Sequence, residues 1–260
     1  MKNIIAAVDF SVSSNNAARY AADMSAAVGA ELHLCHVLDF KAIHPEVPIP
    51  DYVLDETRQG AFEGLEALAG ELRARTGGKI TVATDLETGP IERRVKDFSW
   101  WKKPFLVIRG ASRGEATSIG YLPYPLLIIP PDTVFRPVRN VVIACDAEQI
   151  NNGLPVPFEF LRELHELLHA HFDVLHVATK REQTATVSFR EWRASLMEQF
   201  PELHFISAPT VEEGIREYLE HHPVDWLVVF AAKSGLFHWH KSLSANIVLH
   251  CPLPVMSIQK

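Results

Sequence analysis

The sequence predicts an α/β fold that occurs twice, as two tandem doubly wound domains, each built on a five-stranded parallel sheet. The heptapeptide NIIAAVD at residues 3–9 returns as NVVIACD at residues 140–146. Each copy is a short, almost wholly apolar run, which is typical of a strand buried on both faces of a parallel sheet. Helix and strand patterns alternate after each run, and this order predicts right-handed crossovers with helices on both faces. We therefore predict one domain at residues 1–133 and a second at residues 138–260.

The first predicted domain alternates strands with helices after its opening strand. Asp9 and the serines after it are typical helix-capping residues, and Gly29 is a typical residue at a helix end. The prolines of residues 45–50 predict a surface loop, and Gly77-Gly78 predicts the end of the second helix. The strands are expected at 3–9, 31–38, 79–85, 104–108 and 126–129, and the apolar helix faces at Ala17, Tyr20, Ala21, Met24 and Val28, at Phe62, Leu65, Ala69 and Leu72, and at Ile91, Val95 and Phe98.

The second predicted domain follows the same order of elements. His36-Val37 and His176-Val177 occupy the same place in the two copies. The strands are expected at 140–146, 173–178, 203–207, 225–230 and 254–258, and the apolar helix faces at Leu161, Leu164 and Leu168, at Phe189, Trp192 and Leu196, at Val211, Ile215, Tyr218 and Leu219, and at Leu243, Ile247 and Cys251.

Composition and charge exclude several classes of function. The chain has 260 residues, a formal net charge of −7 and no block of Lys and Arg, so we expect no nucleic-acid partner and no anionic membrane surface. No apolar run approaches the length of a membrane span or a signal-peptide core, and we expect a cytoplasmic protein. Of the three cysteines, Cys35 and Cys145 lie in predicted strands, which favours buried thiols over disulfides.

Three stretches resemble one known family. They are VDFS at the end of the first strand, LHLCHVL at residues 32–38, and the closing KSGL…KSLSANIVLHCPLPVMSI of residues 233–258. The chain resembles the universal stress protein family, in particular its tandem members, over nearly all of its length. The resemblance implies a fold like that of the adenine nucleotide alpha hydrolases. It also implies that the two copies pack about a pseudo-two-fold axis, as an intramolecular pseudo-dimer, with a homodimer of whole chains as an open alternative.

One class of that family binds ATP, and the resemblance implies ATP or another adenine nucleotide as the ligand here. The class uses a carboxylate after strand one, the backbone of strand two, and a loop after strand four of the pattern G-x-x-G followed nine residues later by G-[S/T]. Glycines let backbone N–H groups approach phosphates, and a helix N-terminus adds a favourable field. The residues carried over are Ala7, Asp9, Val37, Arg109, Gly110, Gly114 and Ser118 in the first copy, and Asp146, Val177, Lys233, Ser234, Gly235 and Ser242 in the second.

Both copies depart from the phosphate-binding pattern. In the first copy Gly110 and Gly114 are spaced G-x-x-x-G. The loop after strand four is shorter there, because Pro125 follows Leu106 by 19 residues whereas Pro254 follows Leu227 by 27, a difference of about two helical turns. In the second copy the leading glycines fall on Val229 or Phe230 and on Ala232. We therefore expect weak or no ATP binding, with any residual site in the first copy.

Each of these residues also has a purely structural interpretation. Asp9 and Asp146 are also typical helix caps or turn formers at a strand exit. Gly110 and Gly114 are also suited to a shortened turn, and Arg109 and Arg113 are either phosphate ligands or solvated loop charges. The group Lys233, Ser234, Ser242 and Ser244 surrounds a predicted helix start, where capping competes with anion binding.

No other motif nominates a metal or a catalytic group. His165 and His169 have i, i+4 spacing and His238 and His240 could chelate in an extended segment, yet no further Cys or carboxylate completes either set, so we expect no metal. The pair at residues 100–101, Trp-Trp, favours packing or a partner surface. No nucleophile elbow, Ser-His-Asp order or P-loop is present.

These observations together predict a stress-response or regulatory module that acts by binding and is not an enzyme. Two alternatives stay open: an ATP-binding protein with slow ATP hydrolysis, and a metal- or partner-responsive sensor built on the histidine-rich second half.

Overall fold

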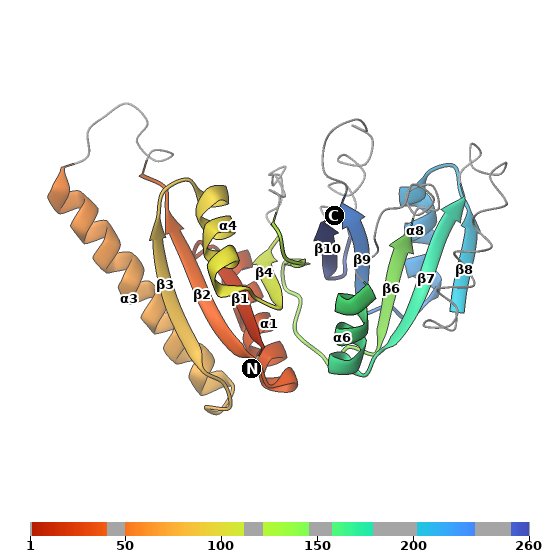
Figure 1. The fold of residues 1–260 in the computed structure, drawn as a ribbon, viewed down its shortest axis with the longest axis horizontal. Coiled ribbons are helices and arrows are strands. Elements are labelled where there is room, and N and C mark those ends of the chain that lie inside the picture. Colours follow the sequence, from red (N-terminus) through yellow and green to blue (C-terminus); the bar gives the residue numbers. More distant parts are fainter. Residues whose placement is uncertain are drawn as a thin grey trace. The chain divides into compact units, whose positions relative to one another are not determined.

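A computed structural model of the chain divides into two units, Met1–Phe135 (unit 1) and Arg136–Lys260 (unit 2). It describes residues 2–40, 50–111, 122–145, 158–178, 202–231 and 251–259. Both units are parallel sheets flanked by helices, so the predicted α/β fold class is confirmed (Figure 1).

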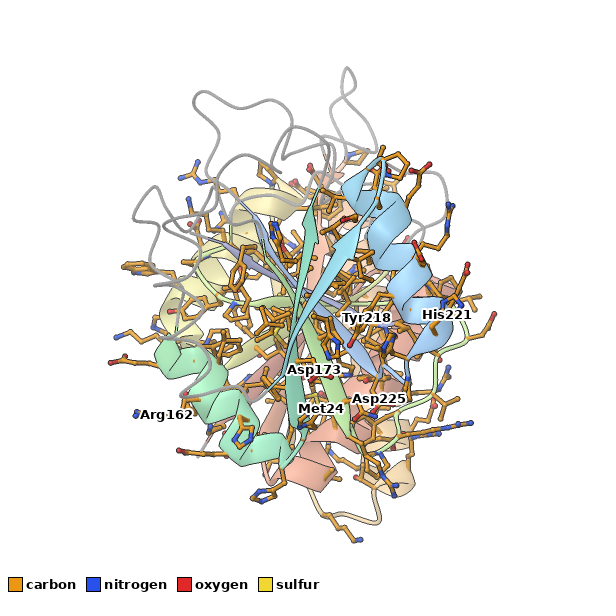
Figure 2. The ribbon with its side chains drawn as sticks, turned by 90° about the vertical axis from the view of Figure 1, so that its right-hand side faces the viewer. Met24, Arg162, Asp173, Tyr218, His221 and Asp225 are labelled. Atoms are coloured by element: carbon orange, nitrogen blue, oxygen red, sulfur yellow. The ribbon has the colours of Figure 1, made fainter. Side chains whose placement is uncertain are left out.

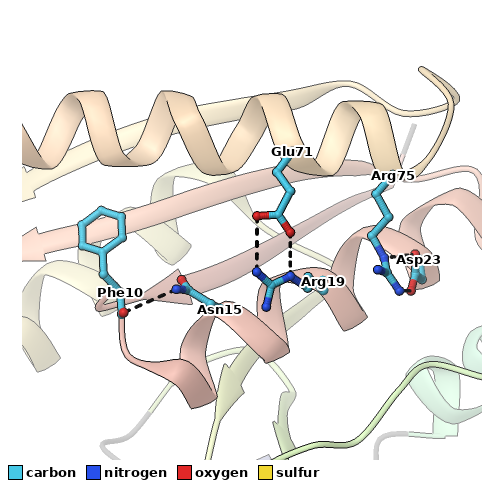
Figure 3. Close-up of polar contacts among 6 residues, drawn as sticks. All are labelled: Phe10, Asn15, Arg19, Asp23, Glu71 and Arg75. Carbon is cyan, nitrogen blue, oxygen red and sulfur yellow. Dashed lines mark hydrogen bonds and ion pairs between the residues drawn. The ribbon is translucent and has the colours of Figure 1, made fainter.

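Unit 1 contains a five-stranded parallel sheet with the strand order β3-β2-β1-β4-β5. Thr84 of β3 hydrogen bonds to Glu66 of α3, whereas its neighbour Asp85 pairs with Lys102 of α4. Because successive strand residues point to opposite faces, α3 and α4 cover opposite faces of the sheet. Helix α1 lies beside α3 (Figure 3). The elements are β1 (Asn3–Val8), α1 (Val12–Val28), β2 (Glu31–Leu38), α3 (Asp51–Arg75), β3 (Val82–Thr88), α4 (Ile91–Lys102), β4 (Leu106–Gly110) and β5 (Leu126–Ile129).

Unit 2 has the parallel strand order β10-β9-β6-β7-β8, in which β6 takes the central place that β1 takes in unit 1. Tyr218 of α8 is buried and Asp173 of β7 is nearly so, whereas Arg162 of α6 and His221 of α8 are exposed (Figure 2). The elements are β6 (Asn140–Cys145), α6 (Phe158–Leu168), β7 (His171–Ala178), β8 (Glu202–Ser207), α8 (Val211–His221), β9 (Trp226–Ala231) and β10 (Val255–Gln259).

The predicted ends of the first helix are confirmed. Ser11 is the N-cap of α1, and its Oγ accepts a hydrogen bond from the Ser14 N–H at 3.2 Å. Gly29 ends the helix with a φ of 68°, and its N–H donates to the Ser25 carbonyl oxygen. A left-handed residue at this place satisfies a carbonyl that the helix leaves without an internal partner, and glycine adopts that conformation without a steric penalty.

Two predicted strands of unit 1 lie two or three residues too early in the chain: β3 is Val82–Thr88 and β4 is Leu106–Gly110. We expected a strand at 79–85, and β3 begins at Val82. The preceding Gly77 and Gly78 have φ values of 61° and 73°, and the Lys79 N–H donates to the Thr76 carbonyl oxygen, so the turn extends further than expected. The strand expected at 104–108 begins at Leu106, because Pro104 has no N–H to donate to the ladder.

The predicted helix faces are correct in part. Leu65, Ala69 and Leu72 are buried as expected, but Phe62 of the same predicted face is 48% exposed. In α4 Phe98 is buried while Ile91 is 53% exposed. The helices expected around 189–196 and 243–251 lie almost entirely outside the described residues. No helix in the described part of the chain is both long and apolar enough to span a membrane.

Cys35 is buried in β2, as predicted for a structural thiol. Burial raises the pKa of its thiol to about 12, and the nearby carboxylates of Asp85 and Glu87 act in the same direction. The thiolate is therefore scarce at neutral pH, and Cys35 behaves as a small apolar residue.

Candidate functional site at the carboxyl end of the unit 1 sheet

The turn between β1 and α1 carries Asp9 on the surface of unit 1. Its side-chain Oδ1 accepts a hydrogen bond from the Ser11 N–H at 2.9 Å, and its own N–H donates to Ser14 Oγ at 3.2 Å. The carboxylate is exposed, although both flanking strands are buried. Asp9 thus closes a short turn that points its carboxylate outward from the end of the central strand.

The pKa of Asp9 lies below its ordinary value. Partial burial acts to raise the pKa, but hydrogen bonds from Ser11, Ser14 and the turn backbone outweigh it and lower the pKa. Hydrogen bonds to the ionised form favour that form. Asp9 is therefore a negatively charged acceptor at neutral pH.

Phe10 follows Asp9 and has a φ of 64°, which is unusual for a bulky residue. Its ring centroid lies 4.6 Å from that of the buried His36, at a tilt of 43°. His36 Nδ1 lies 2.7 Å from the Val8 carbonyl oxygen. Since a carbonyl only accepts, His36 donates this hydrogen bond and fixes the end of β1.

Gly110 ends β4 beside the first turn of α1. A Cβ at this position would lie 2.5 Å from the Ser13 carbonyl oxygen and 2.9 Å from the Ser14 backbone nitrogen. Both atoms belong to the helix backbone, which has little freedom to move away. Glycine here lets the strand end approach the helix start closely, and this packing requirement holds whether or not a ligand binds.

The structure brings five of the predicted site residues of unit 1 to one edge of the sheet. The strand register pairs Val8 of β1 with His36 of β2 and Ala6 of β1 with Ile108 of β4, so the carboxyl ends of the three strands lie side by side. Ligands of open α/β sheets bind at such an edge. The residues placed there are Ala7 and Arg109, which are half-buried, Val37 and Gly110, which are buried, and Asp9, which is exposed.

The remaining predicted site residues cannot be placed, with one exception. Gly114 and Ser118, together with Arg113, lie outside the described residues, and so do Asp146, Lys233, Ser234, Gly235 and Ser242 of unit 2. Val177 is described and buried in β7, where its side chain is the close neighbour of Gly214 in α8.

Sequence reasoning missed three residues of this edge: Phe10, His36 and Gly64. Gly64 lies in the interior of α3, where a Cβ would meet the ring of Phe10 at 3.2 Å. A glycine inside a helix is unfavourable, and this was the available signal for a close contact at Gly64. Nothing in the sequence shows that Phe10 is its neighbour.

The start of α1 is already capped by its own side chains. Asp9 and Ser11 accept the N–H groups of Ser11 and Ser14, and the Asn15 side chain donates to the Phe10 carbonyl oxygen at 3.4 Å. A phosphate placed here would meet the negative carboxylate of Asp9, and the N–H groups of Ser11 and Ser14 already have acceptors. Hydroxyl and amino groups of a ligand, in contrast, would find in Asp9 an ionised acceptor.

No group of three or more His, Cys, Asp or Glu residues in the described ranges has the arrangement of a metal site. The ring of His165 packs edge-on against Phe172 at 5.4 Å, and His169 ends α6 with a φ of 51°. The pair His238 and His240 lies outside the described residues.

Comparison with known proteins gives the family and the fold. Residues 1–119 match the model of the universal stress protein family. No curated protein matches the chain. A universal stress protein from Archaeoglobus fulgidus is 17% identical, with a TM-score of 0.73 over 99% of this chain and 96% of that one. A functionally unknown protein from Pseudomonas aeruginosa is 15% identical, with a TM-score of 0.61 over 100% of this chain and 92% of that one. At these identities the two structures share the fold. Residues 1–119 thus form a domain of the universal stress protein family.

Proposed function

We propose that the chain is a cytoplasmic regulatory protein of the universal stress type, which acts by binding a ligand without turnover. Unit 1 would hold the ligand at Asp9. The observation that carries the proposal is the exposed carboxylate of Asp9, which hydrogen bonds within its own turn keep ionised at the carboxyl end of the central strand. Such a carboxylate binds ligand hydroxyl or amino groups through charge-assisted hydrogen bonds.

The chemistry of this edge favours the nucleoside part of an adenine nucleotide over its phosphates. A ribose offers hydroxyl donors to Asp9, whereas a phosphate would be repelled by it. Gly110, which the family pattern would give to the phosphates, is already in close contact with the backbone of Ser13. These features support a site whose affinity for the nucleotide depends little or not at all on the triphosphate.

The described part of the edge also favours binding over hydrolysis. Asp9 is hydrogen bonded within its turn, and His36 is buried with its Nδ1 bonded to Val8. Neither group has the position of a base beside a free nucleophile. Slow hydrolysis of ATP, which the resemblance to the universal stress protein family implies, stays the alternative.

A calorimetric titration with adenosine, AMP and ATP–Mg tests the proposal. We expect adenosine and AMP to bind with similar affinity and ATP to bind no more tightly. Asp9→Ala should lower the affinity for adenosine by about tenfold, which is the effect of losing one hydrogen bond to a charged group. Asp55→Ala is the matched control, because Asp55 is an exposed carboxylate of α3, 78% accessible at its side chain. Sub-micromolar ATP binding, or phosphate release from ATP, would contradict the proposal.

A second candidate, a partner-responsive function, is supported by helix α4. Trp100 and Trp101 are 67% and 74% exposed, and Lys102 lies over the Trp101 ring at 4.8 Å. The packing interpretation of this pair is therefore wrong, and the partner-surface interpretation stays a prediction. Exposed tryptophans near basic side chains are typical of protein interfaces. Trp100→Ala combined with Trp101→Ala should leave adenosine affinity unchanged if the two functions are separate.

A further inference from the structure

Phe10 is held in a conformation that its own chemistry disfavours. Its φ of 64° lies in the left-handed region, where a side chain with a Cβ is crowded by the backbone. Such a residue persists only when its surroundings determine it, and residues of this kind cluster at functional sites. Phe10 is the residue directly after Asp9, so whatever holds Phe10 also orients the carboxylate.

Two neighbours hold both sides of Asp9. His36 hydrogen bonds to the Val8 carbonyl before it and packs its ring against Phe10 after it. Asn15 donates to the Phe10 carbonyl oxygen (Figure 3). The peptide on each side of Asp9 is therefore tied to a buried group or to the helix.

Helix α3 supplies the third side of this arrangement through Gly64. A Cβ on Gly64 would lie 3.2 Å from both Cε1 and Cζ of the Phe10 ring, which is closer than ordinary van der Waals contact. Gly60 and Gly70 lie in the same helix, and a Cβ on either would meet no atom within 4 Å. Of these three helix glycines, Gly64 alone leaves the space that the ring occupies.

Helix α3 is anchored beside the ring by its buried side chains Leu65, Leu68 and Leu72. Two ion pairs tie it to α1 on the same side (Figure 3). Arg19 Nε lies 2.6 Å from Glu71 Oε1, and Arg75 Nη2 lies 2.7 Å from Asp23 Oδ2. A side chain at position 64 would therefore displace Phe10 more readily than it would displace the helix.

We propose that Gly64 is a positioning residue for Asp9. It leaves room for the Phe10 ring, and the ring, packed between α3 and His36, fixes the turn that carries the carboxylate. Its effect on ligand affinity rests on the proposed function, whereas its effect on the Asp9 turn does not.

The test compares Gly64→Ala with Gly70→Ala, the matched control in open space of the same helix. The first readout needs no ligand: the pKa of the Asp9 carboxyl, followed by NMR of its carboxyl carbon. The second readout is the affinity for adenosine. Both alanines improve helix propensity, so a change of stability alone does not distinguish the two variants. A change in the pKa of the Asp9 carboxyl distinguishes them.

We expect Gly64→Ala to move the pKa of Asp9 upward toward its ordinary value, because the turn that donates to the carboxylate is displaced. Adenosine affinity should fall by less than the about tenfold expected for Asp9→Ala, because the carboxylate is shifted and not removed. Gly70→Ala should change neither. In a Phe10→Leu background, where the ring is absent, Gly64→Ala should have no further effect on Asp9.

Two results would overturn the inference. One is a pKa of Asp9 that is the same in Gly64→Ala as in Gly70→Ala. The other is an effect of Gly64→Ala that persists in full without the Phe10 ring. If the unaltered protein binds no adenosine, the proposed function fails, and the pKa of Asp9 still decides whether Gly64 positions it.

Discussion

His33 Nδ1 on β2 lies 3.1 Å from Asp85 Oδ2 on β3, and unit 2 carries the same pair with its partners exchanged. Asp173 occupies on β7 the place that His33 occupies on β2, and His204 occupies on β8 the place of Asp85. His204 Nε2 lies 3.7 Å from Asp173 Oδ1. Each unit thus places a carboxylate and an imidazole between its edge strand and the neighbouring strand, and in unit 2 a second imidazole, His171 Nε2, lies 2.9 Å from Asp173 Oδ1.

This relationship predicts that His33 and Asp85 of unit 1 can be exchanged for one another with only part of the stability lost. His33→Asp alone places two carboxylates together and should destabilise the protein by about 1–3 kcal/mol, the cost of a buried polar group that loses its partner. The double variant His33→Asp with Asp85→His should recover at least half of that loss. Recovery is incomplete because Lys102, whose Nζ lies 3.7 Å from Asp85 Oδ1, loses its carboxylate. Urea denaturation of the three proteins measures this, and a double variant less stable than the single one would contradict it.

The strands and the position of Asp9 were predictable from the sequence because both depend on short stretches of chain. A buried strand of a parallel sheet is a local apolar run, and Asp9 stands directly after one. The role of Gly110 was not predictable, because the atoms that require a glycine belong to Ser13, nearly a hundred residues earlier in the chain. The same holds for Gly64 and Phe10. The exposure of Phe62 was missed because helical periodicity identifies a face and not its edges.

Replacing either of the two α3 glycines that face open space with alanine should stabilise the protein. Gly60→Ala and Gly70→Ala should each raise the free energy of unfolding by about 0.5–1 kcal/mol, since a helix interior favours alanine and no atom opposes the added Cβ. Chemical denaturation followed by circular dichroism measures the change. A loss of stability in either variant would show that the exposed face of α3 is covered in solution.

Gly110→Ala should destabilise the protein in the absence of any ligand. The added Cβ would stand 2.5 Å from the Ser13 carbonyl oxygen, so β4 and the start of α1 must separate. Overpacking of this kind costs about 1–3 kcal/mol. Thermal melting of the ligand-free protein measures it, with Gly60→Ala as the control for an added methyl group. An unchanged melting temperature would leave Gly110 with a role in ligand binding alone.

Asp9 should make unit 1 less stable in acid. Its pKa is lowered in the folded state, so the stability that it contributes is fully present above the ordinary pKa of 3.8 and is lost as the pH falls through the lower folded value. Asp9→Asn removes this contribution. The difference in urea midpoint between the unaltered protein and Asp9→Asn should therefore be largest near neutral pH and should shrink below about pH 3.8. A difference that grows on acidification would show that the carboxylate is better bonded when protonated.

Gly214→Ala should destabilise unit 2 chiefly through Val177, with a second, looser contact at 3.1 Å from Cβ of Ala208. Gly214 lies in the first half of α8, and a Cβ there would overlap Cγ1 of Val177 and lie 2.9 Å from its Cγ2. Val177 is buried in β7, so its side chain has no open space to enter. The overlap should cost about 1–3 kcal/mol, more than the gain in helix propensity returns.

Val177→Ala removes both methyl groups and, by itself, leaves a cavity that is also destabilising. The added methyl group of Gly214→Ala then fills part of that cavity, so the double variant should be more stable than the sum of the two single losses predicts. Amide hydrogen exchange of β7 measures this within unit 2, and simple additivity would show that α8 yields instead of the valine.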